Sequence, residues 1–355
     1  MESSNGRHDL FKMNPNIPKN LAYCLEYPMS ENSGAAFSDD HYGGFFNPGI
    51  QNYIQSTIDF NSASHYNFSY VSHNLAGYTL MHDLLQIPKN RFPLPRKDKI
   101  RIAYAKNSNR KYYCLSGVLV CRPYLKGNRQ IAATFKLLGG VKNSSYGGHN
   151  HNDAGSYSIM LNGVKIAGEL GGPRFYEFDH WDISHYNFNI TNSYGHPVPV
   201  VGGKLQVGNW IYSYTSSEML KVISTSFKDD EDVITYDLTK AYDVSSLLSL
   251  TRENIFKRAN GLQSVSIIDE AIFTNETSFE VAITSLGNWT TILKKTNELH
   301  GRLTLKNTTI VVTVQSYNAF EMKIETQTNC GTSFTRVGIL ISKPSKYERV
   351  KVIYT

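Results

Sequence analysis

Residues 156–167 read SYSIMLNGVKIA, in which two mostly apolar runs flank an Asn-Gly pair. Such a pair predicts a two-residue hairpin turn, because both central positions of that turn need a positive φ. The sequence therefore predicts two antiparallel strands, at about 156–161 and 164–167, joined by Asn162 and Gly163.

Short β-runs separated by turn residues continue on both sides of this hairpin. They lie at 117–121, 130–137, 233–238, 265–268, 279–283, 309–315, 320–325, 338–342 and 350–354, and Asn260-Gly261 marks a second tight turn. No long stretch after residue 100 keeps an apolar period of 3.6 residues. The pattern predicts a mainly β fold, an antiparallel two-layer β-sandwich.

The N-terminal part of the chain differs from this pattern. It is rich in Asn, Gly, Pro and Tyr, and its helical patches, at about 51–58 and 75–85, are short. Pro93 and Pro95 mark a boundary, because closely spaced prolines remove backbone donors and force extended backbone. We predict a short, partly helical region over residues 1–96 and a sandwich domain over residues 97–355.

The composition is that of a globular protein whose surface relies on uncharged polar groups. Hydrophobic residues make up 41% and charged residues 19% of the 355 residues. The 23 tyrosines suit strands, and they also suit stacking against sugar rings. A net charge of +6 and a pI near 8.9 favour an acidic partner. No nucleic-acid motif is present, so we predict no nucleic-acid binding.

Other sequence signals exclude several classes. The four cysteines, Cys24, Cys114, Cys121 and Cys330, are too widely spaced for a CxxC metal site, and free thiols are the simple interpretation. No run of about 18 apolar residues exists, so we predict no membrane span. Residues 1–10 have no apolar core, so we predict no signal peptide.

Directly before the hairpin, residues 147–157 read GGHNHNDAGSY, a dense group of imidazole, amide and carboxylate side chains. On a strand His149 and His151 would lie on one face. Two imidazoles and a carboxylate are a familiar zinc ligand set, which His151, Glu169 and His196 can supply. The alternative is a polar core in which Asp153 and neighbouring amides satisfy neutral imidazoles.

Four motifs together resemble the heparinase II/III-like family of polysaccharide lyases. They are HNHNDAGSY at 149–157, the hairpin that follows, GELGG at 168–172 and NSYGHPVPVVGGKLQ at 192–206. The family acts on uronate-containing polymers such as heparan sulfate and alginate, and its members are periplasmic or secreted. The resemblance implies that residues 1–96 are a remnant of the α/α toroid that precedes the sandwich in this family.

The resemblance also implies ligands and catalytic residues. His151, Glu169 and His196 fall on the zinc positions, although the family usually has Asp where Glu169 stands, and the ion chiefly braces the loops. His149 falls where the family places a residue near the substrate carboxylate. The tyrosine that acts as acid and base matches Tyr186, with Tyr176 as the second candidate; packing or sugar stacking is the alternative role for either tyrosine.

These residues suit β-elimination at a uronic acid. The C5 proton is acidic only when the neighbouring carboxylate is neutralised, and the O4 leaving group needs a proton. We therefore predict a zinc-containing lyase that cleaves an acidic polysaccharide. A non-catalytic, zinc-stabilised carbohydrate-binding sandwich and a uronate C5-epimerase stay open. A separate toroid-bearing chain, or a homo-oligomer, is the partner that would complete the cleft.

Overall fold

The computed structural model describes residues 109–114, 116–124, 130–137, 151–176, 183–207, 220–258 and 263–355. The predictions for residues 1–96, for His149 and for the Asn260-Gly261 turn lie outside these ranges, and the domain boundary near residue 96 stays a prediction. Within these ranges the chain forms β-strands and short 3-10 helices but no α-helix. The mainly β prediction is confirmed.

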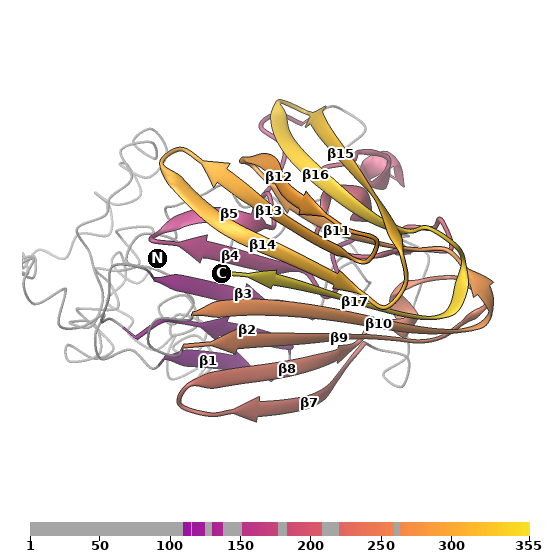
Figure 1. Cartoon of the computed structure of the whole chain (residues 1–355), viewed down its shortest axis with the longest axis horizontal. Coiled ribbons are helices and arrows are strands. Elements are labelled where there is room, and N and C mark those ends of the chain that lie inside the picture. The colour runs from indigo at the N-terminus through magenta and orange to yellow at the C-terminus, as the bar shows by residue number, and fades with distance from the viewer. Residues whose placement is uncertain are drawn as a thin grey trace, which may run out of the picture. The chain divides into compact units, whose positions relative to one another are not determined.

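The strands form three sheets, in which neighbouring strands with a defined register run antiparallel (Figure 1). The five-stranded sheet has the order β1 (Arg110–Tyr113), β2 (Val118–Cys121), β3 (Ile131–Phe135), β4 (Tyr157–Leu161), β5 (Val164–Gly168). The eight-stranded sheet has the order β12 (Asn288–Lys294), β13 (Glu298–Leu305), β14 (Thr308–Ser316), β17 (Ser345–Tyr354), β10 (Ser264–Thr277), β9 (Leu247–Lys257), β8 (Glu231–Asp237), β7 (Lys221–Phe227). The four-stranded sheet has the order β15 (Phe320–Asn329), β16 (Thr332–Ile341), β11 (Phe279–Ser285), β6 (Val200–Val201).

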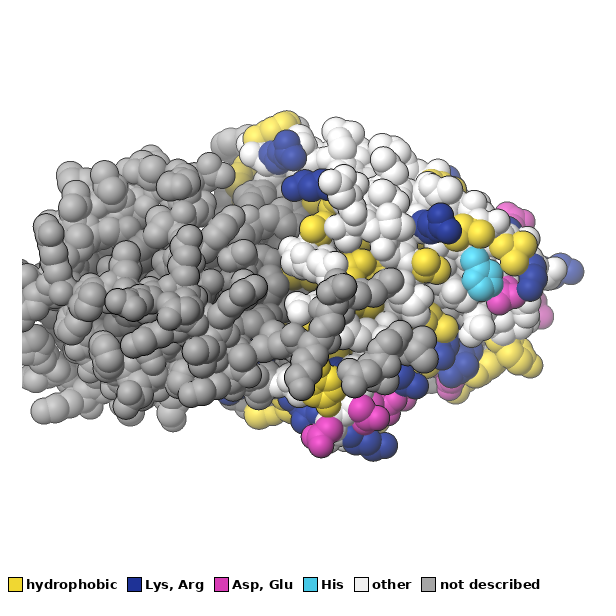
Figure 2. Space-filling model, turned by 60° about the vertical axis from the view of Figure 1, so that its left-hand side comes forward, with side chains coloured by type: hydrophobic (Ala, Val, Ile, Leu, Met, Phe, Trp, Pro, Cys, Tyr) yellow, Lys and Arg dark blue, Asp and Glu magenta, His cyan; other side chains and the backbone are white. Residues whose placement is uncertain are grey.

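The surface of the described part matches the composition. On the face drawn in Figure 2, uncharged polar side chains and backbone predominate, and Lys and Arg side chains are scattered among them. Acidic side chains lie close to several of these cations. On the described part of this face the basic side chains are therefore dispersed.

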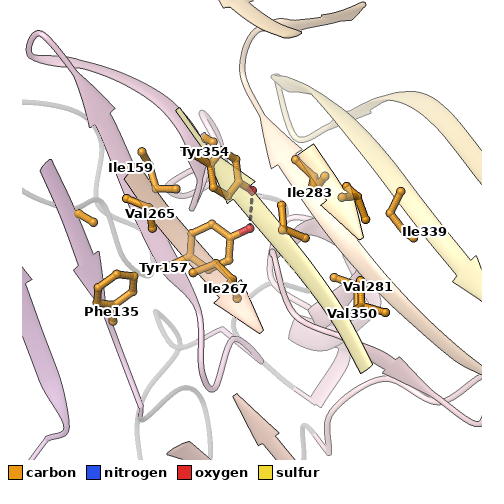
Figure 3. Close-up of a cluster of buried hydrophobic side chains, with 14 of the residues drawn as sticks. Phe135, Tyr157, Ile159, Val265, Ile267, Val281, Ile283, Ile339, Val350 and Tyr354 are labelled. Carbon is orange, nitrogen blue, oxygen red and sulfur yellow. Dashed lines mark hydrogen bonds between the residues drawn. The ribbon is translucent and has the colours of Figure 1, made fainter. Parts of the chain in front are cut away.

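A continuous apolar core lies between the eight-stranded sheet and the other two sheets. Figure 3 shows Phe135 and Ile159 of the five-stranded sheet together with Val265, Ile267 and Val350 of the eight-stranded one. The hydroxyl groups of Tyr157 on β4 and Tyr354 on β17 are 2.6 Å apart, so the layers are also joined by a buried hydrogen bond. The predicted two-layer sandwich is confirmed.

The hairpin predicted from Asn162 and Gly163 is present between β4 and β5. The two residues have φ values of 51° and 79°, and Leu161 pairs with Val164. Every other β-run predicted above overlaps an observed strand, and the observed strands often extend further. The strands that the sequence did not predict are β1, β6, β7, β9, β12 and β13.

Strand β5 ends beside β11 of the four-stranded sheet. Thr284 and Ser285 on β11 donate side-chain hydrogen bonds of 2.7 Å to the carbonyl groups of Gly168 and Ile166, respectively. Gly168 has a φ of 95°, and a Cβ there would lie 2.1 Å from the Tyr157 carbonyl oxygen. Only glycine fits this position. The conformation of Gly168 therefore sets the path of the backbone into Glu169, the next residue.

Candidate metal centre

The first segment of the site, residues 151–156, precedes β4 and is a loop rather than the strand assumed from the sequence. Backbone and side-chain bonds fix it along its length. The amide of Asn152 donates to the Thr191 carbonyl at 2.9 Å, and that of Gly155 donates to the Leu137 carbonyl at 3.0 Å. The side chain of Gln206 bonds both the amide and the carbonyl of Ala154, at 2.8 and 2.9 Å.

The second segment contains the short helix η4 (Ser193–Gly195), directly before His196. Asn192 caps this helix, because its side-chain oxygen accepts a hydrogen bond from the Tyr194 amide at 2.9 Å. The backbone N–H of Gln206 donates a hydrogen bond of 2.9 Å to the Ser193 hydroxyl. Through its side-chain bonds to Ala154, Gln206 therefore ties the second segment to the first.

The two segments bring His151, Asp153 and His196 together. One ligand atom from each residue lies within 4.8 Å of those from the other two, and all three side chains are buried. The His151 and His196 ring centroids are 5.0 Å apart. One carboxylate oxygen of Asp153 accepts from the Lys136 ammonium at 2.5 Å. A group of two imidazoles and a carboxylate can hold a metal ion.

Glu169 is a further buried side chain that contacts the His196 ring. Both of its oxygens are 3.0 Å from His196 Nδ1, and the Ser156 hydroxyl donates to one of them. Burial by itself raises the pKa of Glu169, but the charge and hydrogen bond of His196 outweigh it and hold the pKa below its usual range. Burial lowers the pKa of His196, and the Glu169 carboxylate more than compensates and raises it.

This geometry tests whether the residues fit a metal ion. A proton on His196 Nδ1 bonded to Glu169 leaves the Nε2 lone pair free to bind a metal, and carboxylates commonly orient metal-binding histidines in this way. Within the described ranges, His196 Nε2 and the second oxygen of Asp153 are buried without a hydrogen-bond partner. Buried polar atoms without partners are rare, and a cation would satisfy both. The residues therefore fit a metal ion.

Of the three ligands predicted from the sequence, the structure groups His151 and His196 and adds Asp153. From the sequence, Asp153 was predicted only as a hydrogen-bond partner of the imidazoles. Its His-x-Asp spacing within the dense polar motif was the signal for it. Direct metal binding by Glu169 stays a prediction, because its observed partners are His196 and Ser156.

Tyr186 lies next to this cluster, on helix η3 (Ile183–Asn187). Its ring packs edge-to-face against His185, 4.9 Å away, and the His185 ring lies 6.2 Å from that of His151. Burial, together with the charge of Asp153, raises the pKa of Tyr186 to about 12. His185, which was not predicted from the sequence, is fully buried, and its ring lies between those of Tyr186 and His151.

Tyr176 lies elsewhere in the chain, on an exposed loop that follows Gly171-Gly172-Pro173. The backbone before it is fixed, because the Arg174 amide donates to the Cys330 carbonyl at 2.9 Å. Phe175 packs beside Gly331, in the turn between β15 and β16. A catalytic role for Tyr176 stays a prediction.

No protein-family model matches the sequence, and no curated protein matches it. Solved structures do match. The heparan sulfate lyase HepC from Pedobacter heparinus aligns with 97% of this chain at 12% identity and a TM-score of 0.62. A heparinase III structure aligns with 98% of this chain at 12% identity and a TM-score of 0.63.

The chain spans about half the length of these neighbours, since it covers 47% of the lyase and 49% of the heparinase III. Within the described ranges, no helix is long and apolar enough to cross a membrane. At this level of identity the comparison concerns the fold alone. The chain has a fold similar to that of the heparinase III structures.

Proposed function

We propose that this chain belongs to a polysaccharide lyase that cleaves a uronate-containing acidic polysaccharide by β-elimination. The observation that carries the proposal is the buried cluster of His151, Asp153 and His196, with Tyr186 beside it, in a fold similar to that of known heparan sulfate lyases. The unpaired Nε2 of His196 and the unpaired oxygen of Asp153 within one group of candidate ligands support a metal ion over a purely structural polar core.

In this proposal His151, Asp153 and His196 hold Zn²⁺, and Glu169 orients His196 through Nδ1. A bound zinc ion would supply positive charge that fixes the two ligand-bearing segments and favours an anionic substrate. The segments themselves are already tied together by Gln206. The cluster is therefore suited to bracing these two segments.

Tyr186 is the proposed general acid. With a pKa raised to about 12 the phenol keeps its proton at neutral pH, so it can donate to the O4 leaving group. The C5 proton must then be taken by a separate base, for which a neutral imidazole is suitable. The C5–H and C4–O4 bonds break, a C4–C5 double bond forms, and the leaving oxygen gains a proton. His149 remains the proposed partner of the substrate carboxylate.

The test is to incubate the protein with heparan sulfate, hyaluronan, chondroitin sulfate or alginate and to follow ultraviolet absorbance. Elimination leaves an unsaturated uronate, so we expect absorbance to grow with one of these polymers. Binding without any growth in absorbance would instead support a carbohydrate-binding sandwich. Deuterium entering C5 without chain cleavage would support an epimerase. Either result would overturn the lyase proposal.

A further inference from the structure

Arg252 on β9 is a fully buried arginine with four described hydrogen bonds. Its Nε and Nη2 donate to the two carboxylate oxygens of Asp269, at 2.7 and 2.8 Å. Its Nη1 donates to two backbone carbonyls, that of Gly155 at 2.9 Å and that of Pro197 at 2.7 Å. One side of the guanidinium is thus anchored to a strand, and the other side reaches two loops.

Those two loops are the ones that carry the metal-binding candidates. Gly155 follows Asp153 by two positions, and Pro197 comes directly after His196. A single Nη1 atom therefore joins the backbone of the two segments within two positions of a candidate ligand in each. The anchor is rigid as well, because Asp269 and Arg252 face each other in the register of β10 and β9.

Arginine is suited to this task in a way that lysine is not. Its planar fork can bind a carboxylate in bidentate fashion and still present a nitrogen in a fixed direction, whereas lysine has one flexible ammonium group. The ring of Tyr157 lies 5.8 Å from the guanidinium, which restricts it further. The orientation of Nη1 is therefore set by the sheet rather than by the loops.

We propose that Arg252 is a positioning residue that sets the separation of the segments carrying His151, Asp153 and His196. The proposal rests on the proposed function in one respect, that these residues bind a metal ion. It deepens that function, because it makes metal affinity depend on an ion pair in the eight-stranded sheet that touches no ligand.

The chain contains a matched control for a purely structural role. Arg258, directly after β9, is also fully buried, and it forms an ion pair with the buried Asp232 on β8. Its Nε donates to the carbonyl of Arg122 at 2.8 Å, which belongs to neither ligand-bearing segment. Loss of either arginine removes a buried ion pair, but of the hydrogen bonds described here only those of Arg252 reach the two ligand-bearing segments.

The experiment compares Arg252→Lys with Arg258→Lys in the full chain. Hydrogen exchange is measured without metal, at the hydrogen-bonded amides of Asn152, Gly155 and Gln206, and zinc affinity is measured by titration of the metal alone. We expect Arg252→Lys to speed exchange in both segments and to lower zinc affinity by about 10- to 100-fold. We expect Arg258→Lys to lower the melting temperature while leaving exchange in these segments and zinc affinity unchanged.

Unchanged exchange in Arg252→Lys, or equal changes in both variants, would overturn the proposal. If Arg252→Lys does not fold, Asp269→Asn takes its place, because it keeps the arginine but weakens its anchor; the same two outcomes then apply. If the unmodified protein binds no zinc, the metal part of the proposed function fails. Exchange in the two segments still decides the role of Arg252, so the two failures are distinguishable.

Discussion

Asp153 and Glu169 are two buried carboxylates that stand in different relations to the same imidazole. Asp153 belongs to the group of ligand atoms within 4.8 Å of one another, whereas Glu169 is bonded to His196 Nδ1. The sequence pointed to Glu169 through its place after the hairpin. It could not reveal that Glu169 contacts Nδ1 of His196 while Asp153 joins the group of ligand atoms, because that depends on how separate loops meet.

The pair of variants Asp153→Asn and Glu169→Gln separates these roles. We expect Asp153→Asn to abolish zinc binding, because it removes a ligand charge, and Glu169→Gln to weaken binding by about 10- to 100-fold, as loss of an orienting partner usually does. Zinc titration of the two proteins measures this. Equal loss in both variants, or the larger loss in Glu169→Gln, would instead make Glu169 a direct ligand.

Tyr186 is the residue whose assignment depends most on its surroundings. A tyrosine acting as base at neutral pH would need a lowered pKa, but burial and the charge of Asp153 raise the pKa of Tyr186 to about 12. We expect Tyr186→Phe to lower turnover by about 10²- to 10⁴-fold, the usual contribution of a general acid, without changing zinc content. Tyr176→Phe is the comparison. Activity retained in Tyr186→Phe but lost in Tyr176→Phe would transfer the role to Tyr176.

At the scale of elements, the strands with strong local signals were predictable. The β4–β5 hairpin follows from its Asn-Gly turn and apolar runs, because both features act within a few residues. Strand β9 was missed because two of its buried positions hold Arg252 and Asn254 instead of apolar residues. Strands β7 and β12 were missed for another reason: they are sheet edges with largely exposed side chains.

The end of β5 gives a prediction about how an element supports the site. In Gly168→Ala the new Cβ would meet the Tyr157 carbonyl oxygen at 2.1 Å, in a backbone conformation that L residues rarely adopt. We expect a loss of roughly 2–4 kcal/mol in the free energy of unfolding, measured by urea denaturation, and weaker zinc binding through displacement of Glu169.

Gly203→Ala is the matched control for this change. Gly203 also has a positive φ, of 71°, but nothing lies within 4 Å of the position of its Cβ. Gly203→Ala should therefore lower the free energy of unfolding only through the strain of a positive φ, by roughly 1–2 kcal/mol, and leave zinc affinity unchanged. Similar losses of unfolding free energy in the two variants would mean that the close approach of Gly168 to Tyr157 does not determine the effect of Gly168→Ala.

At the scale of the whole molecule, the sequence predicted the layers but not how they are joined. Alternating apolar positions indicate that each strand has a buried face, and this is sufficient for a sandwich. They do not indicate which buried polar residues cross between sheets. The hydrogen bonds from Tyr157 to Tyr354 and from Arg252 to Gly155 and Pro197 join residues 55 or more positions apart, and such pairings follow only from the assembled fold.

One buried acid lets the stability of the whole sandwich be tested against pH. Glu348 on β17 is fully buried; Asn318 donates to one of its oxygens at 3.0 Å, and the other has no hydrogen-bond partner within the described ranges. Burial raises the pKa of Glu348, against the opposing effect of hydrogen bonds from Asn318 and Ser345. The folded protein therefore holds this proton more tightly than the unfolded chain.

The stability that this proton contributes is complete below the unfolded pKa of about 4.5 and is lost as pH rises through the higher folded pKa. Glu348→Gln keeps a neutral side chain at every pH, so its advantage over the parent should grow from pH 4.5 to pH 8. At pH 8 we expect Glu348→Gln to be more stable than the parent by about 1 kcal/mol, or roughly 2–4 °C in melting temperature. Glu321→Gln, at an exposed position on β15, is the control and should show the parent's pH dependence. A constant difference between Glu348→Gln and the parent across this range would mean that Glu348 titrates alike in both states.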